Sequence, residues 1–222
     1  MLTLHDGGRR LPTAGRADAA GHWLWRHLNL DLAPGDRLAI VGPSGSGKTL
    51  LLRALAGLDA LDAGTVALNG RTLGDWARPR YRAQVAYLPQ TPALPEGTVE
   101  AALRQPFAFG VHAGKAFDHD AIAARLRALD RDADFSARTT DVLSGGERQI
   151  VAFLRTLQLG PRVLLLDEPT ASLDAANTGR IEHLVTDWMD AHAERAVLWT
   201  SHDPAQLARV TDRRLDLADF EP

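Results

Sequence analysis

Alternating leucines mark the first clear secondary-structure element of the chain. Leu28, Leu30 and Leu32 alternate with Asn29 and Asp31. A period of two residues is typical of a strand that buries one of its faces. The alternation therefore predicts a half-buried strand, and the Pro-Gly-Asp turn that follows it ends that strand.

A strand, a glycine-rich loop and a helix are expected next, in direct succession. The short apolar run at 37–41 predicts a strand, and it ends at the glycine-rich loop 42–48. The residues after the loop have the spacing of a helix, with leucines at 51, 52, 55 and 58. Two further short strands are expected at 65–70 and 84–87.

The middle of the chain has a different character, from residue 91 to about residue 159. Prolines punctuate its early part, and Ile122, Leu126 and Leu129 then mark an amphipathic helix. A pair of glycines opens another helix, expected at 147–157. We interpret 91–159 as a helical subdomain inserted into an α/β core. The core would consist of 1–90 and 160–222, so that 1–222 form a single domain.

The pattern after residue 160 is that of a parallel sheet. Residues 162–166 are almost wholly apolar, as strands covered on both faces tend to be. The elements expected after this strand are a helix near 178–192, a strand at 196–199 and an edge strand at 215–217.

Composition narrows the possible partners. The net charge of the 222 residues is −3 and no basic stripe is visible, which argues against nucleic acid as the main partner. Cysteine is absent, so disulfides and thiolate metal sites are excluded. No apolar run reaches the length of a membrane span, and the start lacks the apolar core of a secretory signal. We therefore expect a chain that is soluble by itself and reaches a membrane only through a partner.

The glycine-rich loop matches the phosphate-loop pattern G-x-x-x-x-G-K-[ST]. Its glycines let backbone N–H groups point inward around phosphates, and the helix N-terminus adds positive partial charge. Lys48 is expected to reach the β- and γ-phosphates, and the Thr49 hydroxyl is expected to ligate Mg²⁺. The alternative is an ordinary glycine-rich turn. The expected nucleotide contacts in this segment are Gly42, Pro43, Ser44, Gly45, Ser46, Gly47, Lys48, Thr49 and Leu50.

Two acidic residues end the apolar strand at 163–166. Carboxylates at the end of such a strand are expected to lie beside the phosphate loop of a neighbouring strand. Asp167 would then hold Mg²⁺, directly or through water, and Glu168 would polarise the attacking water. The alternative is a strand that simply ends in polar residues.

The segment Leu-Ser-Gly-Gly-Glu at 143–147 predicts a capped helix. Ser144 has the position of an N-cap, Gly145 and Gly146 open the helix, and Glu147 completes a capping box. An ordinary cap is one interpretation. A helix N-terminus is also an anion site, and a nucleotide already held by a phosphate loop could meet it only on a second copy of the chain.

Together these motifs resemble the ABC ATPase family over nearly the whole chain. The phosphate loop, Gln90, LSGGE, VLLLDE at 163–168, the segment 172–174 and His202 occur in the family's order. The resemblance implies an α/β P-loop NTPase (RecA-like) core with an antiparallel β subdomain and an inserted helical subdomain. It implies that Gln90 touches Mg²⁺ and the water, that Asp174 lies in a loop crossing a dimer interface, and that His202 contacts the γ-phosphate.

The same resemblance implies a function and its partners. The chain would be the ATP-binding subunit of an ABC transporter, hydrolysing Mg-ATP in a head-to-tail homodimer to drive a separate membrane permease. It would lie in the cytoplasm, peripheral on the inner face of the membrane. Three stretches, at 81–92, 155–163 and 196–199, are similar to the ATPase of the ferrous-iron-export ABC system, which indicates metal export. A soluble clamp acting on nucleic acid or ribosomes and a scaffold without turnover are the alternatives.

The permease contact is expected between the two lobes, near 90–110. Phe107 and Phe109 belong either to a groove for a partner helix or to the core of the helical lobe. Because the sequence has no extension after Phe220, we expect no regulatory C-terminal domain.

Two departures from the family pattern stand out. Leu50 replaces the second hydroxyl residue after the lysine, so one phosphate contact is lost. The adenine-stacking aromatic is expected near 14–21, where none is present; His22, Trp23 and Trp25 are the available substitutes, although Trp25 is expected to pack on the core.

Overall fold

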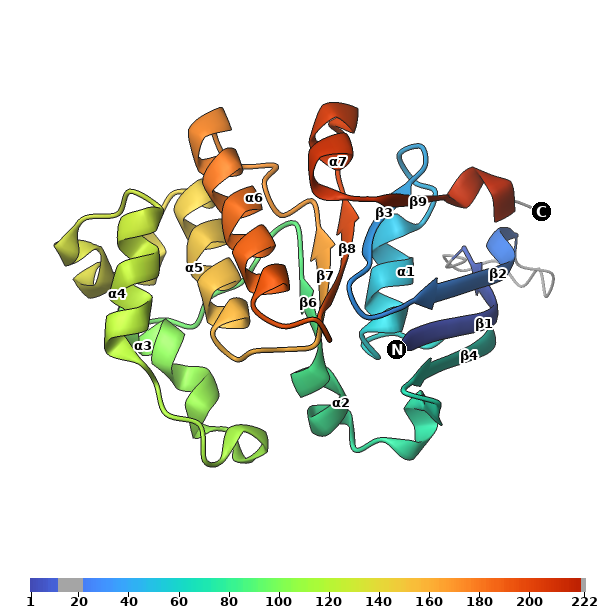
Figure 1. The fold of residues 1–222 in the computed structure, drawn as a ribbon, viewed down its shortest axis with the longest axis horizontal. Coiled ribbons are helices and arrows are strands. Elements are labelled where there is room, and N and C mark those ends of the chain that lie inside the picture. The colour runs from blue at the N-terminus through green and yellow to red at the C-terminus, as the bar shows by residue number, and fades with distance from the viewer. Residues whose placement is uncertain (12–21, 221–222) are drawn as a thin grey trace.

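The computed structural model describes residues 1–11 and 22–220. Two sheets and a group of helices form its layers (Figure 1). The first sheet is antiparallel and has the order β2-β1-β4-β5. Its strands are β1 (Leu2–Arg10), β2 (Trp23–Leu32), β4 (Ala63–Leu68) and β5 (Arg71–Thr72). The leucines that alternate in β2 are buried, as their period predicts.

The second sheet is parallel throughout, with the order β6-β7-β8-β3-β9. Alternate residues of its central strands enter two different cores: Leu164 and Leu166 pack with the helices, whereas Val163 and Leu165 pack toward the antiparallel sheet. Burial on both faces explains why these strands are almost wholly apolar. The strands are β3 (Arg37–Val41), β6 (Val85–Leu88), β7 (Val163–Asp167), β8 (Ala196–Thr200) and β9 (Arg213–Asp216).

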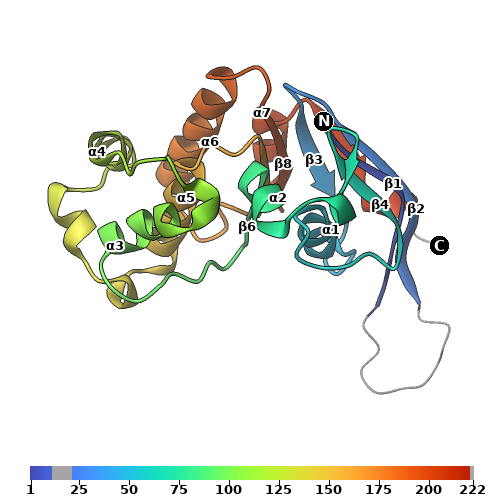
Figure 2. The same ribbon diagram turned by 90° about the horizontal axis from the view of Figure 1, so that it is seen from below.

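Helices cover both faces of the parallel sheet. Helix α1 lies between the parallel and the antiparallel sheets (Figure 2), and its buried leucines join both to one core. Helices α5, α6 and α7 share the opposite core with β7 and β8. The helices are α1 (Lys48–Leu55), α2 (Arg78–Gln84), α3 (Val99–Arg104), α4 (His119–Ala128), α5 (Gly145–Leu157), α6 (Ala175–Asp190) and α7 (Pro204–Val210).

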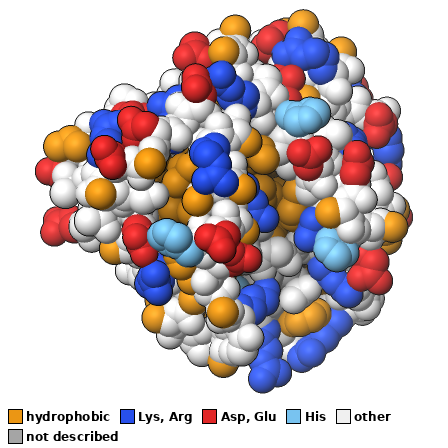
Figure 3. Space-filling model, turned by 60° about the vertical axis from the view of Figure 1, so that its left-hand side comes forward, with side chains coloured by type: hydrophobic (Ala, Val, Ile, Leu, Met, Phe, Trp, Pro, Cys, Tyr) orange, Lys and Arg blue, Asp and Glu red, His pale blue; other side chains and the backbone are white. Residues whose placement is uncertain are grey.

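The segment between β6 and β7 is helical and projects away from the antiparallel sheet (Figure 1). The surface on the side of these helices carries charges of both signs, and hydrophobic side chains gather in a hollow on it (Figure 3). Short 3₁₀ turns complete the chain at Leu73–Asp75, Gln105–Ala108, Gly110–His112, Ala133–Ala137, Thr140–Val142 and Leu217–Phe220.

Several element boundaries differ from their expected positions, and caps explain the helical ones. Helix α5 begins at Gly145 because Ser144 caps it, so both glycines lie in the first turn. Helix α6 begins at Ala175 because Asp174 caps it. The last strand ends at Asp216, because the chain turns into a 3₁₀ helix at Leu217, where the sequence still predicts strand.

Candidate functional site

The phosphate loop joins β3 to α1 in a conformation that requires glycine. The φ angles of Gly42, Gly45 and Gly47 are 146°, 83° and 91°, in the region that side chains disfavour. A Cβ on Gly47 would lie 2.8 Å from Nε1 of Trp25. Trp25 itself is fully buried, which confirms that it packs on the core. The Trp25 ring thus packs directly against the backbone of the loop at Gly47.

Lys48 stands in the first turn of α1 and its side chain folds back over the loop. Its Nζ donates hydrogen bonds to the carbonyl oxygens of Gly42 at 2.8 Å and Pro43 at 3.0 Å. The side chain is largely buried, whereas Thr49 is exposed. The ammonium group therefore points into the concave side of the loop, where phosphates would lie.

Asp167 ends β7 and is 3% exposed. Its Oδ2 accepts a hydrogen bond from the Tyr87 hydroxyl at 2.9 Å, and its Oδ1 accepts one from the Thr200 hydroxyl at 3.0 Å. Burial raises the pKa of Tyr87 well above its usual value, and the charge of Asp167 raises it further. The phenol therefore stays a donor, and each carboxylate oxygen keeps one lone-pair direction for another ligand.

Glu168 lies between two side chains from other strand ends. Its Oε2 accepts a hydrogen bond from Nε2 of Gln90 at 2.9 Å, and its Oε1 lies 2.9 Å from Nε2 of His202. Its backbone has a φ of 47° and its N–H donates to the Thr200 hydroxyl. A left-handed glutamate is uncommon and indicates a functional constraint. Gln90 and His202, which the sequence connects with Glu168 only through the family resemblance, thus both contact Glu168.

The position of the acidic pair relative to the phosphate loop corrects one prediction. The sequence predicts that Asp167 and Glu168 lie on a strand that neighbours the strand of the loop. This is wrong, because β8 lies between β7 and β3 in the sheet. All three strands are parallel, so their carboxyl ends still meet at one edge, and Thr200 at the end of β8 contacts Asp167 and Glu168 there.

Ser144 caps α5 through a reciprocal pair of hydrogen bonds. The backbone N–H of Glu147 donates to the Ser144 hydroxyl at 3.2 Å, and the Ser144 N–H donates to the Glu147 carboxylate at 2.8 Å. The predicted capping box is therefore present. Burial would raise the pKa of Glu147, but hydrogen bonds from Ser144 and Arg138 outweigh it and hold the pKa below its usual value.

The Ser144–Gly146 turn packs on the loop that precedes α6. A Cβ on Gly146 would lie 2.8 Å from the carbonyl oxygen of Ser172, whereas a Cβ on Gly145 would meet its nearest atom at 3.8 Å. Asp174 caps α6, because its carboxylate accepts from the N–H of Asn177 at 2.7 Å. Within residues 1–11 and 22–220, no hydrogen bond or ion pair joins this turn to the phosphate loop. The phosphate loop and this turn are thus two separate features of one chain.

The donors near the phosphate loop suit a magnesium ion. Mg²⁺ is held in nucleotide sites by one or two carboxylates, hydroxyls, phosphates and water. Asp167 supplies a buried carboxylate with free lone pairs, Thr49 an exposed hydroxyl, and Gln90 an amide oxygen whose NH₂ is engaged by Glu168. No group of three or more His, Cys, Asp or Glu side chains in the described part of the chain is arranged to hold a metal ion, so phosphates and water would complete the ligand set.

Tyr87 and Thr200 are residues of the candidate site that no sequence motif identifies. Each is a hydroxyl-bearing residue in an otherwise apolar strand, and that is the one local signal available. Their common partner, Asp167, is 80 residues from Tyr87 and 33 from Thr200, so only the fold reveals the contact.

The expected aromatic contact for adenine is not located. The segment 14–21 lies outside the described residues. Trp23 is half-buried, and the guanidinium groups of Arg10 and Arg26 lie 4.4 Å and 5.0 Å from its ring centroid. Two cations therefore occupy the neighbourhood of this ring.

The two phenylalanines of the helical subdomain have different environments. Phe107 packs edge-on against Phe117, with ring centroids 5.8 Å apart. Phe109 is 52% exposed and lines a groove of about 250 Å³ together with Tyr87, Pro106 and other residues of both lobes. Phe107 therefore belongs to the packing of the helical subdomain, and Phe109 to the groove.

Comparison with known proteins gives one family. The family model described as ABC transporter matches residues 25–171. The Fe(3+) ions import ATP-binding protein FbpC 3 of Rhodococcus jostii is 39% identical over 191 residues, which are 85% of this chain and 54% of that protein. The hemin import ATP-binding protein HmuV of Streptomyces coelicolor is 36% identical over 208 residues, which are 93% of this chain and 71% of that protein. The chain spans about half the length of the FbpC relatives.

Solved structures confirm the fold class. The dimeric post-hydrolysis structure of the ATP-binding cassette MJ0796 with ADP and Pi has a TM-score of 0.83 and 24% identity, covering 97% of this chain and 94% of that one. A bacterial Atm1-family ABC exporter with ATP bound has a TM-score of 0.78 and 24% identity, and the match covers 97% of this chain and 36% of that one. The α/β P-loop core with an antiparallel sheet and inserted helices is therefore the observed architecture.

Two further findings bear on transport. The similarity to a ferrous-iron-export ATPase is imprecise, because the relatives described above are named for the import of Fe(3+) or hemin. None of the described helices has the length and apolar character that a membrane crossing requires.

Proposed function

Because this chain belongs to the family of ABC transporter ATP-binding domains, we propose that it is the subunit that hydrolyses ATP to drive a separate membrane permease. The observation that carries the proposal is the position of Glu168, held between Gln90 and His202 at the carboxyl edge of the sheet. We propose one domain over 1–222, with its core at 1–90 and 160–222 and its helical subdomain at 91–159.

The phosphate loop binds the triphosphate. Backbone N–H groups between Gly42 and Leu50 surround the phosphates, and the N-terminus of α1 adds positive partial charge. Lys48 exchanges its bonds to the loop carbonyls for the β- and γ-phosphate oxygens. Asp167, Thr49 and Gln90 would hold Mg²⁺, which neutralises charge on the β- and γ-phosphates when bound.

Hydrolysis proceeds by in-line attack of water on the γ-phosphorus. Glu168 accepts a hydrogen bond from the water and draws off its proton as the new P–O bond forms and the bond to ADP breaks. His202 and Gln90 fix the direction of the carboxylate through the contacts already present. His202 is 59% exposed, so its ring can also reach the γ-phosphate.

A second copy of the chain completes each site. The Ser144–Gly146 turn is a helix start that suits an anion but has no nucleotide of its own, and the loop that ends at Asp174 packs against it. In a head-to-tail dimer the turn of one copy meets the γ-phosphate held by the other, and two ATP molecules close the interface. The dimeric assembly of MJ0796, a fold relative, supports this arrangement.

The permease is proposed to dock in the groove beside Phe109. Apolar residues at the junction of the two lobes suit the tip of a partner helix, and the groove wall includes Tyr87, three residues before Gln90. Binding of the permease in this groove would place the chain on the cytoplasmic face of the membrane. The names of the relatives support iron or an iron complex as the imported cargo. Their transport names give no support to a nucleic-acid or ribosome clamp.

Substitution of Glu168 by Gln tests this function. The variant keeps the shape of the side chain but removes the base, so ATP turnover should fall by about 10²- to 10⁴-fold, while ATP binding persists. We expect an ATP-dependent dimer in size-exclusion chromatography, because the bridging γ-phosphate is no longer removed. The matched control is Glu194→Gln, which makes the same chemical change at a side chain that is 69% exposed. Equal and negligible turnover in wild type and variant would favour a scaffold without hydrolysis.

A further inference from the structure

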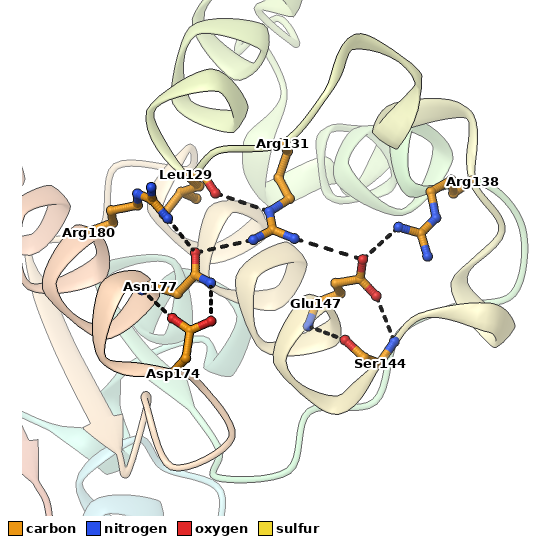
Figure 4. Close-up of polar contacts among 8 residues, drawn as sticks. All are labelled: Leu129, Arg131, Arg138, Ser144, Glu147, Asp174, Asn177 and Arg180. Atoms are coloured by element: carbon orange, nitrogen blue, oxygen red, sulfur yellow. Dashed lines mark hydrogen bonds and ion pairs between the residues drawn. The ribbon is translucent and has the colours of Figure 1, made fainter.

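A network of polar side chains connects the starts of α5 and α6 (Figure 4). These are the two helix starts that the proposed function directs at the second copy. The network passes through Arg131, which follows α4 in a turn of the helical subdomain. The Nε of Arg131 donates to the carbonyl oxygen of Leu129 at 3.0 Å, so the guanidinium group is anchored to its own turn.

On the α5 side, Arg131 contacts the carboxylate that closes the capping box. Its Nη1 lies 3.9 Å from Oε1 of Glu147, and Nη1 of Arg138 donates to the same oxygen at 2.6 Å. The other oxygen of Glu147 accepts from the N–H of Ser144. Both guanidinium groups lie over the buried ring of Phe135, at 5.9 Å and 5.5 Å. The carboxylate is 15% exposed, so little solvent screens this charge pair.

On the α6 side, Arg131 contacts the residue that Asp174 caps. Its Nη2 donates to Oδ1 of Asn177 at 3.2 Å. The side chain of Asn177 is well buried and its NH₂ group donates to Asp174 at 3.1 Å. Arg180 donates to the same oxygen of Asn177 at 3.3 Å and binds Asp130 with its other nitrogen. The α6 cap is therefore oriented by an amide that Arg131 holds from outside the helix.

Arg131 differs from its two neighbours in what it joins. Of the two residues Glu147 and Asn177, Arg138 contacts only the first and Arg180 only the second. Among the hydrogen bonds and ion pairs of the described part of the chain, only those of Arg131 reach both. Its planar guanidinium group presents donors at fixed angles, so it donates to Asn177 and lies within ion-pair distance of Glu147 at the same time.

We propose that Arg131 is a positioning residue that holds the Ser144–Gly146 turn and the Asp174 loop in one fixed relation, so that they engage the second copy's nucleotide together. The inference rests on the proposed function, since it concerns the half-site that one chain offers to its partner. It follows that loss of Arg131 impairs the site whose turn comes from the altered chain. The phosphate loop of that same chain stays competent.

Mixed dimers test this assignment. Lys48→Met inactivates the phosphate loop of one chain. Gly145→Asp inactivates the turn of the other, because it puts a carboxylate where the γ-phosphate would lie. Its Cβ has room, at 3.8 Å from the nearest atom, and an acidic residue favours the first turn of a helix. Neither variant should turn over ATP alone, and their mixture should regain activity from the one composite site in each mixed dimer, on the order of a quarter of the wild-type rate.

Arg131→Met is then added to one chain at a time. On the Lys48→Met chain, which supplies the working turn, it should reduce the regained activity at least fivefold. On the Gly145→Asp chain, which supplies the working phosphate loop, it should leave that activity within twofold. Arg180→Met on the Lys48→Met chain is the matched control and should cause the smaller loss, because it leaves the bridge from Glu147 to Asn177 in place.

The outcomes separate the two proposals. If the simple mixture of Lys48→Met and Gly145→Asp regains nothing, the shared site fails, and the role of Arg131 fails with it. If that mixture works but Arg131→Met reduces activity equally on either chain, the residue is merely structural and the inference is overturned. The inference is also overturned if Arg131→Met has no effect on the chain that supplies the turn, or no more than Arg180→Met.

Discussion

Gly146→Ala should weaken the contact between the α5 start and the loop before α6. The added Cβ would lie 2.8 Å from the carbonyl oxygen of Ser172 and 3.1 Å from Cδ2 of Leu173. The first neighbour is backbone, which yields only by a shift of the chain. Overpacking of this kind costs about 1–3 kcal/mol. Alanine in place of glycine contributes about 1 kcal/mol in favour of the helix, so the net loss of stability should be about 0–2 kcal/mol.

Gly145→Ala provides the matched comparison. Both glycines lie in the first turn of α5, and neither needs a positive φ angle. A Cβ on Gly145 meets its nearest atom, the Cβ of Ser172, at 3.8 Å, an ordinary van der Waals distance. This variant keeps the helical gain without the collision. The two variants should therefore differ by about 1–3 kcal/mol, with Gly145→Ala the more stable.

Thermal or urea unfolding of the nucleotide-free chains measures this difference. For a domain of this size, 1 kcal/mol corresponds to about 2–4 °C in Tm, so the expected separation is well above the error of calorimetry. Turnover gives a second readout, because a displaced Ser172 loop also moves the cap at Asp174. Equal melting temperatures for the two variants would refute the close approach of Gly146 to Ser172.

Two further predictions concern hydrogen bonds to carboxylates. The pKa of Glu147 is held below its usual value of 4.5. The ionised form therefore stabilises the fold above that pH, and this contribution is lost as the pH falls through the lowered pKa. Glu147→Gln should lower Tm at pH 7, and the difference in Tm from wild type should narrow below about pH 4. Tyr87→Phe removes the donor to Asp167 without changing the ring, and should cost about 1.5–3 kcal/mol in urea unfolding. An unchanged midpoint would show that water replaces the phenol.

Local patterns in the sequence predict the strand–loop–helix order around Lys48 and the cap of α5. The spacing of glycines and Lys48 depends on residues within one loop, and the cap at Ser144 depends on residues within one helical turn. Physical rules that act over a few residues decide both. The first strand is different, because Gly7 and Gly8 interrupt its alternation and the pairing to β2 shifts register there, so no clear period marks it.

Long-range order is what the sequence does not predict. Nothing in the apolar run at 196–199 shows that it inserts between β7 and β3, because strand order depends on how crossovers fold back on the sheet. Arg131 likewise stands in a polar turn like many others. Its partners are 16 and 46 residues further along the chain, and only the packing of α5 against α6 brings them within reach.

The left-handed backbone at Glu168 bears on the proposed catalytic cycle. The N–H of Glu168 donates to Thr200, and Gln90 and His202 contact its carboxylate. These restraints all come from one chain and need no nucleotide. Under the proposed function, the general base would therefore already be oriented in a separate subunit, and we expect pairing of two subunits around ATP, rather than rearrangement of the glutamate, to control when hydrolysis occurs.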